Sequence, residues 1–155
     1  MIQRIQTIYL FLAAVLLCVS AYFPLVRFVP IEGEGFVSMS ALSFTSLGLE
    51  NFSLERPYGI VAAFGLAALI SLYTIFLYKN RKRQMLLSMV AALIVVVAYG
   101  FVLFYSLRAV EQTSLQVEPN WLVLAMPLVA ILLLLMARHH IKKDEALVRA
   151  ADRIR

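Results

Sequence analysis

Four long apolar segments, separated by short polar stretches, are the feature that most constrains how this chain can fold. They cover residues 5–27, 57–78, 84–107 and 120–137. A helix needs about 20 predominantly apolar residues to cross a bilayer, and each segment is close to that length or longer. With 63% hydrophobic and only 15% charged residues, the chain is also far more apolar than soluble domains usually are. The sequence therefore predicts a single membrane domain, a bundle of four transmembrane helices.

The distribution of charge predicts the orientation of this bundle. Eleven of the fourteen lysines and arginines lie at the N-terminus, in the connection 79–83 and in the tail 138–155. The other three are Arg27, Arg56 and Arg108, which lie in or next to residues 28–56 and 108–119. Because the positive side of a membrane protein usually faces the cytoplasm, we expect both termini to be cytoplasmic and the latter two segments to be external loops. The basic residues on the expected cytoplasmic side include Lys79, Arg81, Lys82, Arg83, Arg138, Lys142 and Lys143.

The long first loop is predicted to contain β-structure. Apolar and polar side chains alternate from Val37 to Thr45, which is the pattern of a half-buried strand. Ser46-Leu47-Gly48 would then supply a turn, and residues 49–54 would return as the second strand of a hairpin. An isolated hairpin is marginally stable, so residues 114–118 are a candidate third strand. We expect a small antiparallel hairpin or sheet outside the membrane, between the first two spans.

The second span carries a small residue at every fourth position, which predicts a helix-packing face. A stripe of small side chains lets another helix approach closely where lipid removes the hydrophobic drive for association. The alternative is that Gly and Ala are simply common in membrane helices. Pro57 suits the start of this helix, Pro24 is expected to end or kink the first span, and Pro127 to kink the fourth. The small residues are Gly59, Ala63, Ala67 and Ser71.

The tail 138–155 is predicted to be an amphipathic helix that continues out of the membrane. Its apolar residues follow the spacing i, i+3, i+4, i+7 from Leu147 to Ile154. Such a helix can lie on anionic lipid or dock onto a partner, and the pattern leaves both open. Taken with the apolar residues of the first loop, the tail provides the candidates for partner contact: Phe44, Leu49, Phe52, Leu147 and Ile154.

The membrane spans offer no visible carrier of catalytic or cofactor chemistry. Their central parts contain no Asp, Glu, Lys, Arg or His, which disfavours a small exporter with an intramembrane carboxylate and a haem protein with axial histidines. His139 and His140 are adjacent, so on a helix they diverge and cannot easily hold one metal ion from one face. Cys18 is the only cysteine and can form no internal disulfide. We expect no enzyme activity, no cofactor and no metal site.

Charge elsewhere does not change this expectation. The net charge of +5 follows from the topology of the loops and does not indicate a nucleic-acid partner. The acidic residues of the first loop match no known calcium loop, although they could bind a divalent cation or serve an enzyme at the membrane surface. They are Glu32, Glu34, Glu50 and Glu55.

The two ends of the chain resemble a family of small bacterial membrane proteins. The start reads Met1-Ile-Gln-Arg-Ile-Gln-Thr-Ile-Tyr-Leu10, and the close reads Lys143-Asp-Glu-Ala-Leu-Val-Arg-Ala-Ala-Asp-Arg-Ile-Arg155. On these motifs the chain resembles domain of unknown function 4293, a family of the Bacteroidetes group, and the resemblance covers the whole chain. It implies a Gram-negative inner membrane with periplasmic external loops, and it brings no activity or site residues. The layout also looks like that of claudins, but the Trp and cysteine pair of their first loop are absent here.

These observations predict a non-enzymatic accessory or scaffolding subunit of a larger envelope complex. Its partners would be membrane lipids and other membrane proteins, contacted through the first loop, the small-residue face of the second span and the tail. A second possibility is a small transporter or lipid-handling protein that acts as an oligomer. A third is an enzyme that uses the glutamates of the first loop. The pathway of the transporter would be lined by Ser71, Thr74, Ser88 and Tyr99.

Overall fold

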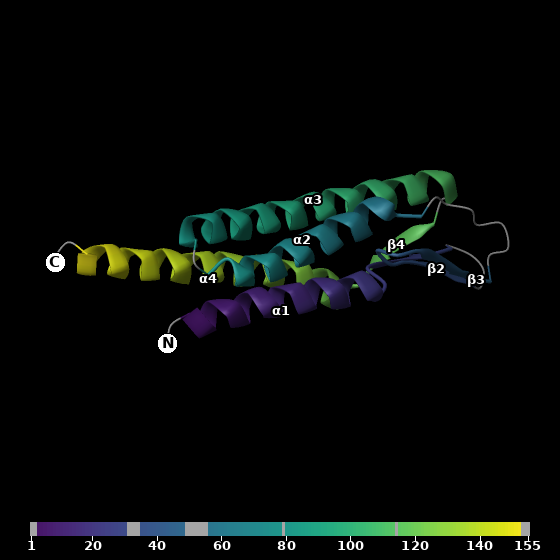
Figure 1. Cartoon of the computed structure of the whole chain (residues 1–155). Helices are drawn as coiled ribbons and strands as arrows, with labels where there is room; N and C mark the ends of the chain where they lie inside the picture. The colour runs from purple at the N-terminus through teal and green to yellow at the C-terminus, as the bar shows by residue number, and fades with distance from the viewer. Residues whose placement is uncertain (1–2, 31–34, 49–55, 79, 114, 153–155) are drawn as a thin grey trace.

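The protein is a bundle of four long helices with a four-stranded sheet at one end (Figure 1). The helices are α1 (Gln3–Tyr22), α2 (Tyr58–Phe76), α3 (Arg81–Thr113) and α4 (Trp121–Asp152). The strands are β1 (Val26–Val29), β2 (Phe36–Met39), β3 (Phe44–Leu47) and β4 (Gln116–Pro119). The computed structural model describes residues 3–30, 35–48, 56–78, 80–113 and 115–152.

The helices contact one another in a closed ring: α1 with α2, α2 with α3, α3 with α4, and α4 with α1. The two termini lie at the same end of the bundle and the sheet lies at the opposite end (Figure 1). We call these the basic end and the sheet end. At 33 and 32 residues, α3 and α4 are each about 50 Å long. They therefore exceed the roughly 30 Å of a hydrocarbon core, and α4 extends past the other helices at the basic end (Figure 1).

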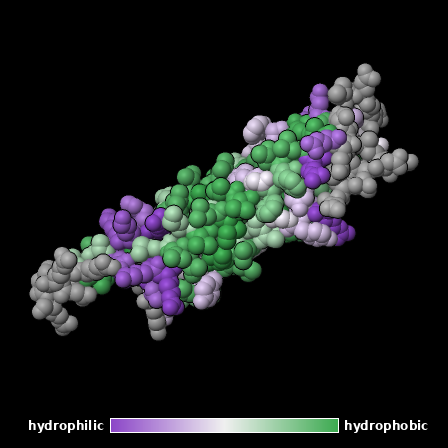
Figure 2. All heavy atoms as spheres, turned by 90° about the horizontal axis from the view of Figure 1, so that it is seen from above, coloured by the Kyte–Doolittle hydropathy of each residue, from purple (hydrophilic) through white to green (hydrophobic). Residues whose placement is uncertain are grey.

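The buried positions of the helices include many alanines, and many large apolar side chains are exposed on the outside of the bundle. Leu69, Phe76 and Leu122 are examples of large side chains that are mostly exposed. Figure 2 shows, on the face that it presents, an apolar band across the middle of the molecule with hydrophilic residues toward both ends. This arrangement suits helices that pack in lipid, and all four helices are long and apolar enough to cross a membrane. The chain is thus built as a multi-pass membrane protein. The buried alanines of the helices include Ala13, Ala14, Ala63, Ala67, Ala91, Ala98, Ala130 and Ala137.

The sheet has the order β3-β2-β1-β4, and all its neighbouring strands are antiparallel. Phe28 and Val37 are fully buried against the end of the bundle. Arg27 alternates to the other face, where its guanidinium lies 5.8 Å from the ring centre of Phe36. Three strands lie between α1 and α2 in the sequence, whereas β4 lies between α3 and α4. The predicted small antiparallel sheet is confirmed. Three of its strands follow α1 and precede α2 in the sequence, but in space the sheet lies at the end of the bundle (Figure 1).

The first helix is shorter than predicted, because residues 26–29 form β1 and not the end of a span that continues to residue 27. Pro24 offers no N–H to a helix and restricts the backbone of the residue before it, so α1 ends at Tyr22. The candidate strand at residues 114–118 is a member of the sheet as β4, but it pairs with β1 and not with the hairpin. Strand β1 has only four residues, which are too few for the alternation of apolar and polar side chains to distinguish the strand from the apolar span before it.

The hairpin turn lies earlier than the sequence pattern predicted. Met39 of β2 pairs with Phe44 of β3, so the connection is residues 40–43. Ser46-Leu47-Gly48, the predicted turn, instead begins within β3. The Oγ of Ser40 closes the actual turn, since it accepts a hydrogen bond from the Ser43 N–H at 3.2 Å and donates one to the Ser43 carbonyl at 3.1 Å.

The third helix is longer than the predicted span 84–107 at both ends. It begins at Arg81 because the Oδ1 of Asn80 accepts a hydrogen bond from the Arg83 N–H at 3.3 Å, as an N-cap does. Beyond the predicted end it continues to Thr113, and residues 108–113 include no Gly or Pro. Residues 81–83 of the predicted connection 79–83 therefore belong to the first turn of α3. Residues 108–113, half of the predicted loop 108–119, form the last turns of the same helix. The predicted return strand 49–54 lies outside the described residues.

The fourth helix runs unbroken past residue 137, with Pro127 inside it. The predicted tail helix is thus the continuation of α4 as far as Asp152. At the start of α2, Pro57 occupies the N-cap position, one residue before the predicted place.

Candidate functional site

The polar side chains inside the bundle are engaged within the protein. The hydroxyls of Ser71, Thr74 and Ser88 each donate to the carbonyl four residues earlier in the same helix, at 2.7, 2.7 and 2.9 Å. The Tyr99 hydroxyl donates to the carbonyl of Leu124 and so joins α3 to α4. No buried side-chain nitrogen or oxygen among the described residues lacks a hydrogen-bond partner. The hydroxyls of the four residues that were predicted to line a pathway therefore all donate to backbone carbonyls.

The small residues of α2 lie on its buried side. Ala63, Ala67 and Ser71 are buried, and Gly59 is half-buried against α3. A Cβ on Gly59 would lie 2.8 Å from Cδ1 and 3.0 Å from Cγ of the Phe101 ring. At Gly59, where α2 meets α3, there is accordingly no room for a side chain in the present arrangement.

At the sheet end, some apolar side chains pack the sheet onto the core, whereas others are exposed. Phe44, a predicted contact residue, is half-buried, and its ring centre lies 6.5 Å from that of Phe28. It belongs to the packing of the sheet on the core. The large apolar side chains exposed on this hairpin are instead Leu42 and Leu47, at 50% and 56%. The alternation of apolar and polar residues could have identified Leu47 as an exposed strand residue only if the hairpin turn had been placed at residues 40–43. Leu49 and Phe52, the other predicted contacts of the loop, lie outside the described residues.

Strand β3 forms an edge of the sheet. Among the described residues it pairs only with β2, and Thr45, Ser46 and Leu47 are all exposed. The Ser40 N–H donates to the Ser43 carbonyl at 3.0 Å, which makes these two residues a hydrogen-bonded pair. Since such pairs alternate along an antiparallel ladder, the N–H and carbonyl groups of Ser46 point to the side of β3 that faces away from β2.

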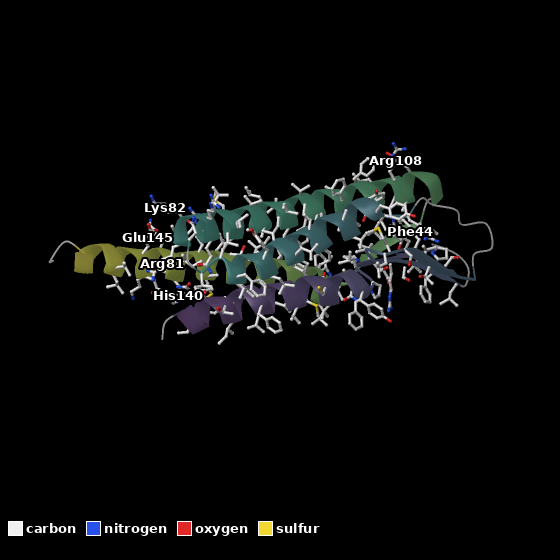
Figure 3. The ribbon with its side chains drawn as sticks, viewed as in Figure 1. Phe44, Arg81, Lys82, Arg108, His140 and Glu145 are labelled. Atoms are coloured by element: carbon white, nitrogen blue, oxygen red, sulfur yellow. The ribbon has the colours of Figure 1, made fainter. Side chains whose placement is uncertain are left out.

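At the basic end, the first turn of α3 lies beside the extended part of α4 (Figure 3). Arg81, Lys82 and Arg83 come from α3, and Arg138, Lys142 and Lys143 from α4. Five of these side chains are exposed, and Arg81 is half-buried. Lys79, which the charge pattern also included, lies outside the described residues. The predicted basic residues are thus gathered at one end of the bundle.

A buried carboxylate at this end was not predicted. Asp144 of α4 is only 8% exposed, and its Oδ2 accepts a hydrogen bond from the side-chain amide of Gln6 in α1. Its backbone carbonyl accepts a hydrogen bond from Nη1 of Arg81 at 2.9 Å. We call these three residues the Asp144 clasp, because they join α1, α3 and α4. An acid within a strongly basic tail is the signal that could have revealed it.

The tail buries the side of α4 that carries Asp144. Ile141 is fully buried beside Asp144, whereas Leu147 is 56% exposed. His140 stacks on Tyr9 of α1 with 5.5 Å between ring centres, and His139 lies on the exposed side. Ile154 lies outside the described residues. Leu147 is therefore an exposed apolar residue of the tail, while the residues that bind the tail to the bundle are Ile141, His140 and Asp144.

No group of three His, Cys, Asp or Glu side chains in the described part of the chain could hold a metal ion. The exposed side chain of Cys18 lies on α1. The loop glutamates Glu32, Glu34, Glu50 and Glu55 all lie outside the described residues.

Comparison with known proteins places the chain in a family whose function is open. No curated protein matches it. A family model described as "Domain of unknown function (DUF4293)" matches residues 2–154. This match covers nearly the whole chain and agrees with the resemblance carried by the two ends. The chain therefore belongs to the domain of unknown function 4293 family.

Proposed function

We propose that this protein is a non-enzymatic accessory subunit of a larger complex in the bacterial inner membrane. Its termini face the cytoplasm and its sheet faces the periplasm, where it recognises a partner protein. The observation that carries the proposal is the edge strand β3, which pairs with β2 alone among the strands that the structure describes and lies at the sheet end. The polar groups inside the bundle support it, because they are engaged by backbone carbonyls and leave the exposed ends as the places for function.

The open edge is suited to strand addition. A partner segment in extended conformation can hydrogen-bond to the outward N–H and carbonyl groups of Ser46. Leu47 and Leu42 would supply apolar contacts beside this ladder, since both are about half exposed. Exposed edge strands are usually blocked by charge or proline, and the β3 sequence Phe-Thr-Ser-Leu contains neither.

A Ser46→Pro substitution is expected to abolish partner binding and to leave the bundle folded. Proline removes the outward N–H of this residue but not the hydrogen bonds between β2 and β3. The measurement is native purification in mild detergent from cells that express the protein at natural abundance, followed by quantitative mass spectrometry. A partner present in stoichiometric amount with the natural protein should fall to background with Ser46→Pro.

Ser46→Val is the matched control, because valine keeps the N–H and favours a strand. It should retain the partner in full. Equal recovery of the partner with Ser46→Pro would contradict recognition at the β3 edge. Purification of the natural protein with no stoichiometric partner would contradict the accessory role itself.

The orientation has its own test in intact cells. In a Cys18→Ser background, Ser46→Cys should react with a membrane-impermeant maleimide that enters the periplasm, whereas Lys143→Cys should react only after lysis. Both positions are exposed, at opposite ends of the bundle. The reverse pattern of labelling would show that the basic end faces outward, against the positive-inside rule.

A further inference from the structure

We propose that a cleft between α3 and α4 at the basic end binds the headgroup of an anionic phospholipid. The cleft has a volume of about 560 Å³. Its α3 wall includes Lys82, Met85 and Met89, and its α4 wall includes Arg138 and Lys142. The site is independent of the partner surface proposed for β3, which lies at the other end of the bundle.

The cations of the cleft converge from two helices. Arg138 and Lys142 are one helical turn apart and therefore lie on the same face of α4. Lys82 stands opposite them on the first turn of α3. Together with the single carboxylate of Glu145, the lining carries three positive charges and one negative charge. Arg138 can bind two phosphate oxygens at once, while the lysines act as mobile point charges.

The apolar part of the cleft selects a lipid over a free anion. Met85, Leu86 and Met89 follow Lys82 at positions i+3, i+4 and i+7, so all four share one face of α3. Leu86 is 61% exposed and Met89 is 43% exposed, and both lie on the way from the cations into the spanning part of the helix. A ligand that satisfies the whole cleft needs a phosphate at one end and an apolar chain at the other. Basic pockets between transmembrane helices are known to hold such headgroups.

A second cleft at the same end provides a comparison. It has a volume of about 420 Å³ and is lined by residues of α1, α2 and α3, among them Gln6, Ile75 and Gln84. Arg81 is the one cation in its described lining, and that guanidinium already donates to the Asp144 carbonyl. Positive charge is thus concentrated in the cleft between α3 and α4.

The test is native mass spectrometry of the purified full chain with an equal mixture of dioleoylphosphatidylglycerol and dioleoylphosphatidylcholine. The natural protein should retain phosphatidylglycerol in preference. The double variant Arg138→Gln/Lys142→Gln should lower the ratio of retained phosphatidylglycerol to phosphatidylcholine by about tenfold or more. The charge-preserving variant Arg138→Lys/Lys142→Arg should keep most of the preference, which separates loss of charge from loss of fold.

The matched control is Arg83→Gln/Lys143→Gln, which removes two exposed cations from the same end but outside the cleft. It should leave the preference within about twofold of the natural protein, because surface charge away from the headgroup is screened. An equal loss in this control, or no preference in the natural protein, would overturn the proposal. Displacement of the bound lipid by inorganic phosphate at the same concentration would also overturn it, because the site would then recognise the anion alone.

Discussion

Replacement of Asp144 by alanine should lower the free energy of unfolding by about 2 kcal/mol. The variant leaves the amide of Gln6, itself only 4% exposed, without the acceptor that it has in the Asp144 clasp. Unfolding in mixed dodecylmaltoside and sodium dodecylsulfate micelles measures this loss. Amide hydrogen exchange measures where it acts, and we expect protection to fall most in the part of α4 that extends beyond residue 138.

Two further variants test whether the loss of stability comes from the Asp144 carboxylate itself. Asp144→Asn keeps an oxygen that can accept from Gln6, so its loss of stability should be smaller than that of Asp144→Ala. Lys143→Ala changes the exposed neighbour and should stay within about 0.5 kcal/mol of the natural protein. If Asp144→Ala were as stable as Lys143→Ala, the clasp would contribute nothing measurable to the packing of the tail.

Replacement of Gly59 by leucine should destabilise the bundle by about 2 kcal/mol. The first atom of the new side chain would lie 2.8 Å from the Phe101 ring, so α2 and α3 would have to move apart or the ring would have to change its rotamer. The same micelle titration measures the effect. A second substitution, Phe101→Ala, should recover part of the loss because it removes the ring that the leucine meets.

Gly65 provides the matched control on the same helix. It is exposed, and a Cβ placed on it would meet nothing within 4 Å. Gly65→Leu should therefore be neutral or stabilising, since leucine favours a helix more than glycine does. An equal loss of stability in Gly65→Leu and Gly59→Leu would show that close approach of the helices at Gly59 is not what the glycine provides.

The elements that sequence patterns predicted well are those with a long local signal. A spanning helix must keep its side chains apolar over many consecutive residues, because lipid offers no partner to a polar group. Each apolar run shows this requirement by itself, without reference to the rest of the chain. The prediction of four long apolar helices follows from it. The gathering of basic residues at one end follows equally, since Arg81 and Lys142 come together once the helices alternate in direction.

The boundaries were less predictable because backbone hydrogen bonding, and not hydropathy, decides them. Asn80 starts α3 three residues before the apolar run begins, through the hydrogen bond that its side chain accepts. Ser40 closes the hairpin in place of the glycine-containing turn at Ser46-Leu47-Gly48. Serine and asparagine can form such bonds at many positions, so their presence alone selects none of them.

By itself, the sequence determined the number of apolar helices, the end of the bundle at which positive charge collects, and membership of the family. The tertiary structure alone decided what each short or polar segment does. Val26–Val29 becomes a strand because β2 and β4 are there to pair with it, and β4 comes from a segment nearly ninety residues later. Asp144 is buried because Gln6, from the other end of the chain, supplies its hydrogen bond. The physical reason is common to both cases: a bilayer acts on every residue of a span, whereas a strand or a buried carboxylate is stable only beside a particular distant partner.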